Sequence, residues 1–307
     1  MGHRGRILLL ALACAGAIAG CGLGPGRGTS NVTVTVTRGF GTGTVGTITK
    51  SKVPGSETVM RMLERSFHVS TRYGGGFVES IDGLSGNGSR HDWFYYVNGI
   101  QAGQGAASTD VHAGDRIWWD LHDWSATDTI PAVVGSFPEP FVHGIGGKRF
   151  PTALECAKDT GVACKRAGSG LNASGVPVAS QLLGTGSGQA TITVIVGTFN
   201  DIKPVIAAAL LAKGPGSSGV YAKFGAGGRT LQLLDPAGKV VRTLGPGSGL
   251  VAATADANST PTWLITGTDP QGVAAAASAL SAGRLRDRFA LAVRGATDYS
   301  VPQQGAS

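Results

Sequence analysis

Aromatic side chains are concentrated in one short stretch of this 307-residue chain. Seven of them lie between Trp93 and Trp124, in the runs Asp92–Gly99 and Gly114–Trp124, and the one tryptophan outside this stretch is Trp263. Aromatic rings have large apolar faces that either pack into a core or stack on a flat ligand. These residues could therefore bind a flat ligand by stacking. The alternative is that they pack into a core.

Strand alternation predicts that both runs are bulky on two faces. Tyr96 points away from Trp93 and Tyr95, and Trp118 points away from Trp119. A small domain has one core, so a second domain or a ligand is expected to cover the other face. The residues expected to bind a ligand are Trp93, Tyr95, Tyr96, Asn98, Trp118, Trp119, Asp120, His122 and Trp124.

Polar residues within the runs are candidate anchors for such a ligand. They are Asn98, Asp120 and His122, and the remaining histidines are too dispersed along the chain to indicate a metal site. The chain contains no nucleophile elbow, no phosphate-binding loop and no zinc-protease motif. We therefore predict that the protein is not an enzyme and has no resident cofactor.

Charge and composition exclude other classes of function. The formal net charge is +7, but the basic residues are scattered and form no run, which does not favour nucleic-acid binding. The chain is 42% apolar, so it can bury a core, and its length allows about two domains. Its 50 glycines indicate many turns.

The N-terminus has the pattern of an export signal. A short basic start precedes apolar Ile7–Ile18, which is too short to span a bilayer, and small residues follow up to Cys21. The ending Ile18–Cys21 resembles a bacterial lipobox, and this resemblance implies cleavage before Cys21 and acylation of its thiol by palmitate. We expect residues 1–20 to be a signal peptide and residues 21–30 a tether.

Two further cysteines are expected to form a disulfide. Cys156 and Cys164 remain once the signal and the candidate lipid site are set aside, and an exported protein permits a disulfide. Within one helix these residues would lie about 12 Å apart, which is too far. Pairing therefore requires a turn, and Asp159–Gly161 supplies one.

The first half of the chain predicts a small α+β domain over residues 31–136. Val and Thr alternate over Asn31–Thr37, which is typical of a half-buried strand. A second short strand follows, and Ser56–Arg65 is predicted to be a helix with Ser56 as its N-cap. Further strands are expected at Phe67–Arg72 and Phe77–Ile81, before the two aromatic runs.

The second half predicts a connector and an α/β domain. Residues 137–189 are expected to connect the domains, with a short helix at Phe150–Ala157 and mostly loop over Gly168–Gln189. The α/β domain is expected over residues 190–298. Two strand–helix–strand units are expected there. The first has strands at 191–198 and 219–224 around a helix at 201–213, and the second has strands at 262–268 and 289–293 around a helix at 270–280, capped by Asp269. A hairpin is expected between them at 230–244.

The aromatic motifs carry a resemblance to a known family. Trp93–Gly99, Gly105-Ala106, Val111 and Gly114–Asp120 resemble the bacterial domain related to the C-terminal β-domain of transcobalamin and intrinsic factor. This resemblance covers residues 31–136, about a third of the chain. It implies a β-grasp-like fold and suggests a corrinoid as ligand. The vertebrate carriers also have an α/α barrel, which this sequence lacks.

Two hypotheses of function follow. The first is a lipid-anchored binding protein on the outer face of the cell membrane, which captures a corrinoid such as cobalamin, or another flat small ligand, for a membrane importer. The second is a structural or protein-interaction lipoprotein of the cell envelope, in which the aromatic residues pack the two domains together. Burial of Trp93, Tyr96, Trp118 and Trp119 without an adjoining cleft would favour the second hypothesis.

Overall fold

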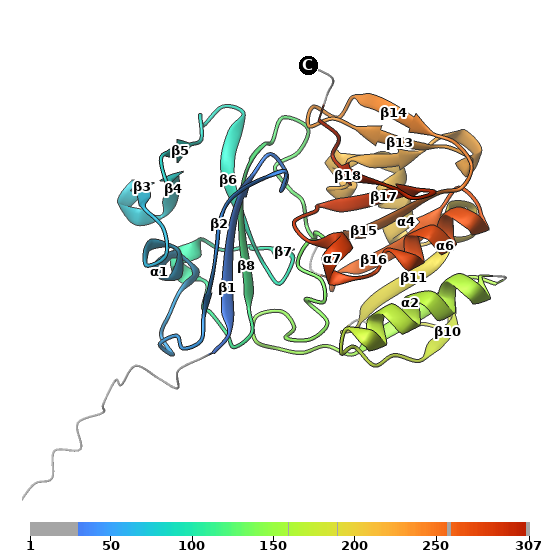
Figure 1. Ribbon diagram of the computed structural model, residues 1–307, viewed down its shortest axis with the longest axis horizontal. Helices are drawn as coiled ribbons and strands as arrows, with labels where there is room; N and C mark the ends of the chain where they lie inside the picture. The colour runs from blue at the N-terminus through green and yellow to red at the C-terminus, as the bar shows by residue number, and fades with distance from the viewer. Residues whose placement is uncertain (1–29, 159, 189, 257–258, 305–307) are drawn as a thin grey trace, which may run out of the picture.

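The computed structural model describes residues 30–304, except for 159, 189 and 257–258. The predicted signal peptide and the predicted lipid site Cys21 lie outside the described residues. Figure 1 shows two halves side by side, with the N-terminal half in blue to green and the C-terminal half in yellow to red. Within the described ranges, no helix is long and apolar enough to cross a membrane.

A five-stranded sheet forms the centre of the N-terminal half. Its order is β2-β1-β8-β6-β7, with β1 parallel to β8 and the other neighbours antiparallel. The strands are β1 (Val32–Arg38), β2 (Gly43–Lys50), β6 (His91–Val97), β7 (Ile100–Gln101) and β8 (Arg116–Asp123). The three valines of β1 point into the core on one face and its threonines point to the other face, as the alternation predicts.

The helix and a small second sheet cover the valine face. They comprise α1 (Val59–Glu64), the antiparallel strands β3 (Val69–Arg72), β4 (Phe77–Ile81) and β5 (Leu84–Ser85), and the 3-10 turns η1 (Tyr73–Gly75) and η2 (Ala106–Ser108). Helix α1 is shorter than predicted, because Thr58 rather than Ser56 accepts the capping hydrogen bond, from the Arg61 N–H at 3.3 Å. The preceding Glu57 is buried and pairs with Arg65 at 2.7 Å.

A seven-stranded sheet forms the centre of the C-terminal half. Its order is β10-β9-β11-β16-β15-β17-β18, in which the first four strands are parallel and the last three alternate in direction. The strands are β9 (Thr152–Cys156), β10 (Ser180–Leu182), β11 (Ile192–Thr198), β15 (Ser248–Thr254), β16 (Thr262–Gly267), β17 (Ala290–Arg294) and β18 (Thr297–Val301).

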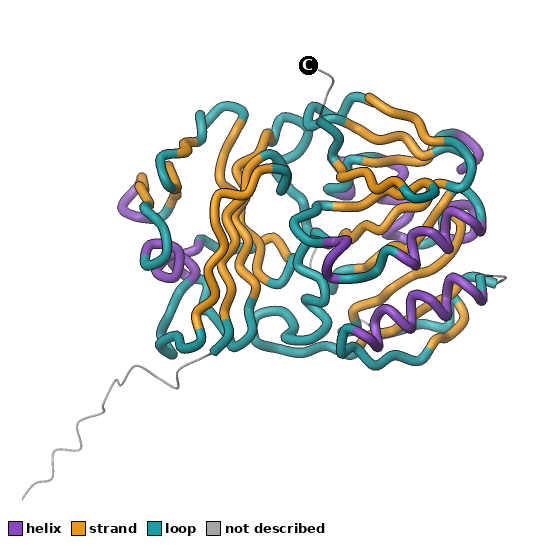
Figure 2. Tube along the Cα trace, viewed as in Figure 1, coloured by secondary structure: helices purple, strands orange, loops and turns teal. Residues whose placement is uncertain are grey.

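Helices and a hairpin cover the two faces of this sheet (Figures 1 and 2). One core contains α2 (Gly161–Ala173) and α6 (Pro270–Ser278). The opposite core contains helical turns and a three-stranded sheet. The remaining elements are α3 (Phe199–Ile202), α4 (Ile206–Lys213), α5 (Pro215–Ser218), α7 (Ala282–Leu285), η3 (Ala226–Gly228), β12 (Ala222–Phe224), β13 (Leu231–Leu234) and β14 (Val240–Leu244). The predicted hairpin is confirmed as β13 and β14.

The predicted helix at Phe150–Ala157 is wrong, because this segment forms strand β9. Pro151 indicated a helix start, but the buried Leu154 and Cys156 instead pair with β10 and β11 in the sheet. Tertiary pairing outweighs the local helix-start signal here.

Loop was also the wrong prediction for part of Gly168–Gln189. Helix α2 continues through Gly168 and Gly170, although glycine disfavours helix interiors. A Cβ at Gly170 would lie 2.8 Å from the Leu280 carbonyl oxygen, so the glycine allows α2 to pack closely against the segment after α6. Residues 137–189 therefore contribute two strands and a helix to the C-terminal half, instead of only connecting the halves.

The predicted disulfide is confirmed, since Cys156 and Cys164 are bonded with their Cα atoms 5.9 Å apart. It links the end of β9 to the first turn of α2. The prediction that strand 219–224 closes a strand–helix–strand unit with β11 is wrong, because β12 belongs to the separate three-stranded sheet. The fold is thus mixed α and β, with more sheet than helix.

Candidate functional site

The aromatic strands β6 and β8 present two different faces, as the alternation predicts. Their antiparallel register places Tyr95 opposite Trp119 and Tyr96 opposite Trp118. Paired residues point to the same side of a sheet. Trp119 therefore lies in the core of the N-terminal half, whereas Trp118 lies in the core shared with the C-terminal half.

The first face, which contains Tyr95 and Trp119, packs into an apolar core made only of residues of the N-terminal half. The rings of Tyr95 and Trp119 stack with their centroids 4.7 Å apart. The Tyr95 hydroxyl donates to the Gln104 carbonyl at 2.6 Å, and burial raises the pKa of this phenol. Trp93 donates to the Leu84 carbonyl at 3.3 Å. These rings pack on protein and leave no open wall.

The second face is covered by aromatic side chains of the C-terminal half. Phe289 packs edge-on against Tyr96 at 5.5 Å and against Trp118 at 5.1 Å, and Tyr221 contacts Phe40 at 5.1 Å. Trp118 and Tyr96 are 3% and 0% exposed, so neither face is available for stacking on a ligand. Burial raises the pKa of the Tyr96 phenol well above its usual range.

A buried carboxylate organises the polar part of the second face. Asp120 accepts hydrogen bonds from the backbone N–H groups of Phe40 and Gly41, each at 2.9 Å, and from the Thr37 hydroxyl at 2.5 Å. It also contacts His122 Nδ1 at 2.9 Å. Phe40 and Gly41 have positive φ angles, which turn both N–H groups toward the carboxylate.

His122 is held between two aromatic rings. Its ring centroid lies 4.5 Å from those of both Phe40 and Phe94, and Asp120 fixes its Nδ1 side. The ring is buried at the boundary between the halves, and the residue lines a surface cleft there. A histidine oriented by a carboxylate is suited to hydrogen bonding with a bound molecule.

Asn98, the third expected polar anchor, hydrogen-bonds only to protein groups among the described residues. Asn98 is fully buried, donates to Asp115 and to the Gly144 carbonyl at 2.8 Å each, and accepts from the Arg116 N–H at 2.9 Å. Burial raises the pKa of the Asp115 carboxyl, although its hydrogen bonds oppose this effect. Of the nine expected ligand-binding residues, Tyr95 and Trp124 are partly buried and the others are buried.

An open cleft of about 620 Å³ lies at the rim of the boundary between the halves. The N-terminal half contributes the β1–β2 turn, the start of β6 and the end of β8, and the C-terminal half contributes the β13–β14 turn and the last described residues. Its lining comprises Arg38, Gly39, Phe40, Thr42, Gly43, Arg90, His91, Leu121, His122, Asp123, Asp235, Pro236, Ala237 and Gln304.

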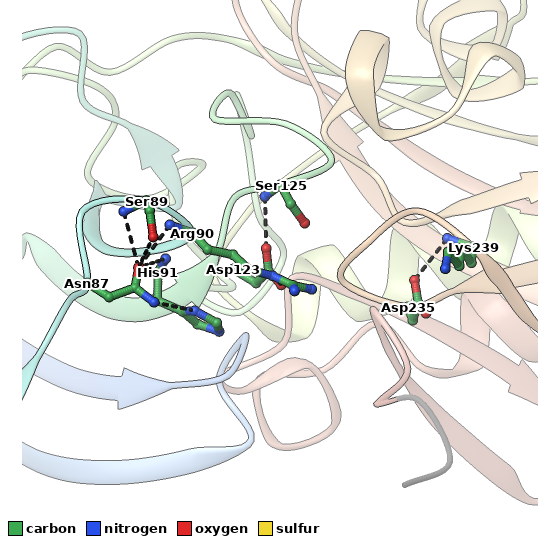
Figure 3. A network of polar contacts seen from close by, with 8 residues as sticks. All are labelled: Asn87, Ser89, Arg90, His91, Asp123, Ser125, Asp235 and Lys239. Atoms are coloured by element: carbon green, nitrogen blue, oxygen red, sulfur yellow. Dashed lines mark hydrogen bonds and ion pairs between the residues drawn. The ribbon is translucent and has the colours of Figure 1, made fainter.

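Figure 3 shows the polar groups on both sides of this cleft. Arg90 Nε donates to Asp123 Oδ2 at 2.6 Å, and the Ser125 N–H donates to the other carboxylate oxygen at 2.8 Å. Burial by itself raises the pKa of Asp123, but the bonds from Ser125 and Arg90 outweigh it and the net shift is downward. Asp123 is therefore an anion at neutral pH.

The loop that presents Arg90 is fixed from within. Asn87 Oδ1 accepts from the backbone N–H groups of Arg90 and His91, at 2.8 and 2.9 Å. Across the cleft, Asp235 accepts from the Lys239 N–H at 2.9 Å in the predicted hairpin turn. Local turns of this kind hold charged side chains in place before any ligand arrives.

Sequence reasoning missed most of the cleft residues. Arg38, Phe40 and Arg90 were not singled out, because each follows or precedes an ordinary glycine or serine turn. The glycines on both sides of Phe40 are a signal that could have pointed to Arg38 and Phe40, whereas Arg90 has no comparable signal. Within the described ranges, no group of three or more His, Cys, Asp or Glu side chains could hold a metal ion.

A family model matches part of the N-terminal half. Residues 56–123 match a family described as a domain of unknown function, DUF4430. This match covers α1 through β8 and includes both aromatic strands. No curated protein matches the chain.

Two solved structures show a distant likeness to part of the chain. One is a "putative metal binding protein" from Ruminococcus gnavus, with 21% identity and a TM-score of 0.25, covering 31% of this chain and 97% of that one. Another is haptocorrin in complex with Cbi, with 20% identity and a TM-score of 0.25, covering 31% of this chain and 26% of haptocorrin. At these values neither likeness bears on function.

Proposed function

We propose that this chain is an exported, lipid-anchored protein that binds a small polar molecule in the cleft at the rim between its two halves. The observation that carries the proposal is the cleft itself, about 620 Å³ in volume and lined by charged side chains from both halves. This volume lies within the usual range for small-molecule sites. The ligand would meet Arg38 and Arg90 at the sides and His122 at the floor.

Arg38 is the cleft residue best suited to recognise a ligand. It is exposed at the end of β1 and forms no ion pair among the described residues, whereas Arg90 is engaged with Asp123. A free guanidinium binds carboxylate or phosphate groups through paired hydrogen bonds. Its presence supports a ligand that carries an acidic or strongly polar group.

A corrinoid is the more specific form of this proposal, and it rests on the sequence resemblance. The buried faces of Trp118 and Tyr96 leave no surface for stacking on a corrin ring. A corrinoid would therefore bind through its polar side chains at the cleft rim, as cargo for a membrane importer. Anchoring would occur through Cys21, and labelled palmitate incorporated by the wild type and not by Cys21→Ser would test it.

Calorimetric titration tests the binding proposal directly. The full chain, purified in detergent, is titrated with cobalamin and cobinamide, and its thermal stability is screened against small organic acids and phosphates. We expect saturable binding that Arg38→Ala weakens about tenfold, because a charge-assisted hydrogen bond contributes about 1.5 kcal/mol. The matched control is Arg229→Ala, an exposed arginine that lines no part of this cleft.

The outcomes separate the two forms of the proposal. If neither corrinoid binds but an acid or phosphate does, the corrinoid form is wrong and the cleft proposal stands. If Arg38→Ala and Arg229→Ala have equal effects, the cleft is not the binding site. If nothing in the screen binds, the second candidate function is favoured.

The second candidate is a structural or interaction lipoprotein of the cell envelope. Burial of the four rings Trp93, Tyr96, Trp118 and Trp119 favours it, whereas the hollow of about 540 Å³ that Trp118 also lines does not. In that case the aromatic residues hold the halves together and the rim cleft has no ligand. Capture of other envelope proteins by crosslinking, unaffected by Arg38→Ala, would support this function.

A further inference from the structure

A second hollow lies along the threonines of β1 and β2, away from the rim cleft. The strand register places Thr33 opposite Thr49 and Thr35 opposite Thr47. The hydroxyl oxygens of Thr33 and Thr49 lie 3.1 Å apart, and the Thr47 hydroxyl donates to Thr35 at 3.5 Å. These rows of paired hydroxyl groups lie about 7 Å apart along the strands.

The threonine rows lie on the same face as the buried aromatic residues. In the parallel register of β1 with β8, Thr33 pairs with Arg116 and Thr35 pairs with Trp118. The C-terminal half covers the Trp118 part of this face but leaves the β1–β2 edge open. The sheet therefore continues from an aromatic contact into a hydroxyl-lined surface.

This surface is the floor of a groove. One part, of about 540 Å³, is lined by Thr33, Thr35, Thr44, Thr47, Arg116, Ile117, Trp118, Gly135, Ser136, Arg286 and Asp287. A second part of about 370 Å³ also contains Thr33 and Arg116, and continues to Asn31, Thr49 and His143. The shared residues make the two parts continuous along β1.

Two guanidinium groups line the groove, that of Arg116 beside Thr33 on the same sheet and that of Arg286 from the C-terminal half. Arg116 Nη1 donates to the Phe137 carbonyl at 2.9 Å, which holds the side chain at the groove. Arg286 is exposed. Neither arginine forms an ion pair among residues 30–304 as described. Two carboxylates also line the groove, that of Asp287 in the first part and that of Glu139, which accepts a hydrogen bond from the His143 N–H, in the second.

Ser136 contributes one more hydroxyl group to the wall of the groove. Its hydroxyl group can both donate and accept.

We propose that this groove binds an acidic saccharide. Hydroxyl side chains both donate and accept, so the Thr33 and Thr35 rows match a ligand that is itself rich in hydroxyl groups. Arg116 and Arg286 match a carboxylate or phosphate on that ligand. The site is distinct from the rim cleft, with which it shares no lining residue.

The test is calorimetric titration of the full chain with tetragalacturonate, maltotetraose and inorganic phosphate, at 150 mM salt. We expect tetragalacturonate to bind at least tenfold more tightly than the other two probes. Arg286→Ala should weaken it about tenfold and the isosteric Thr35→Val about threefold, from the loss of a charged and a neutral hydrogen bond. Asp287→Asn should tighten it by removing a like charge.

Matched controls exclude general attraction to a basic protein. Arg229→Ala and Thr243→Val change exposed residues outside the groove and should leave binding unchanged. Equal effects of Arg229→Ala and Arg286→Ala would overturn the proposal, as would equal binding of maltotetraose or of phosphate alone. Absence of tetragalacturonate binding to the folded wild type would also overturn it. Arg38→Ala reports separately on the rim cleft, so the two proposals fail independently.

Discussion

The two faces of the β1–β8–β6 sheet differ in how they are buried. Residues close in sequence complete the first face, where Trp93, Ile117 and Trp119 meet α1 and the small sheet. The second face is completed by residues more than 100 positions away, with Phe289 and Tyr221 packed on Trp118, Tyr96 and Phe40. The first face is almost purely apolar, whereas the second contains the buried Asp120 and His122.

The aromatic cluster therefore has two roles, one within the N-terminal half and one between the halves. An apolar face needs only volume and shape, so it stabilises the half that contains it. A face with buried hydrogen bonds also requires geometry. The bonds of Asp120 fix Phe40 and His122, whose rings contact Tyr221 and Phe289 of the C-terminal half. A Cβ at Gly135 would lie 2.6 Å from the Trp118 ring and 2.7 Å from the Arg288 nitrogen. The two halves therefore pack closely around Trp118.

The largest expected effect is on the first face. Trp119→Ala should lower the free energy of unfolding by about 3–5 kcal/mol, because it removes a large ring from a closed core. Urea unfolding followed by far-UV circular dichroism measures the loss. Trp124→Ala, at a partly buried site after β8, is the control and should cost less. Equal losses would mean that the first face is not the better packed region.

The second face would be broken by Asp120→Asn. We expect a loss of about 3 kcal/mol, because the substitution places an amide where a carboxylate accepts from two backbone N–H groups, a hydroxyl and His122. Calorimetry should then show the two halves unfolding in separate transitions. A single transition with unchanged midpoint would show that Asp120 does not hold the halves together.

Removing the disulfide tests whether instability in the C-terminal half reaches the second face. The double variant Cys156→Ala, Cys164→Ala should lose about 2.5 kcal/mol, from the entropy of a short closed loop. The aromatic contact should keep the halves in one unfolding transition. Near-UV circular dichroism of the buried tryptophans reports on this contact, and a signal lost before the main transition would contradict the expectation.

The smallest effect concerns the pH dependence at the edge of the second face. Burial raises the pKa of the Asp287 carboxyl, against the opposing effect of Arg286. A raised carboxyl pKa means that the ionised group destabilises the fold above this pKa, and that the cost disappears below the unfolded value of about 3.9. Asp287→Asn should therefore raise the melting temperature at pH 7.5, and raise it less at pH 4.5.

A carboxylate with an ion pair provides the opposite control. Asp298 pairs with Arg284, so Asp298→Asn should lower the melting temperature at pH 7.5. The left-handed backbone at Asp287, with φ of 56°, tolerates asparagine, and so the substitution adds no strain. A lower melting temperature for Asp287→Asn at pH 7.5 would show that its charge stabilises the fold.

Local patterns predicted the strands and their faces well. The Val/Thr alternation gave β1, and the aromatic alternation correctly separated Trp118 from Trp119. The Cys156–Cys164 disulfide was also predicted correctly, from spacing and compartment. Each of these depends on neighbours within a few residues, where side-chain period and chain geometry decide the result.

Elements that depend on distant partners were predicted less well. Strand β9 was predicted as a helix, because its pairing with β10 and β11 is not visible in its own residues. Part of helix α2 was predicted as loop, because glycine usually disfavours a helix. Gly170 is accommodated in α2 because it allows close packing against Leu280, which is distant in the sequence. The cleft residues Arg38, Arg90 and Asp235 come together only when the two halves meet.

The sequence by itself determined that two bulky aromatic faces exist and that a single small core could not use both. Only the tertiary structure decided what covers the second face. Phe289 and Tyr221 cover it, His122 and Asp120 are buried there, and the open cleft lies at the rim. The physical reason is that alternation fixes the direction of a side chain, whereas its partner depends on how segments distant in the chain pack.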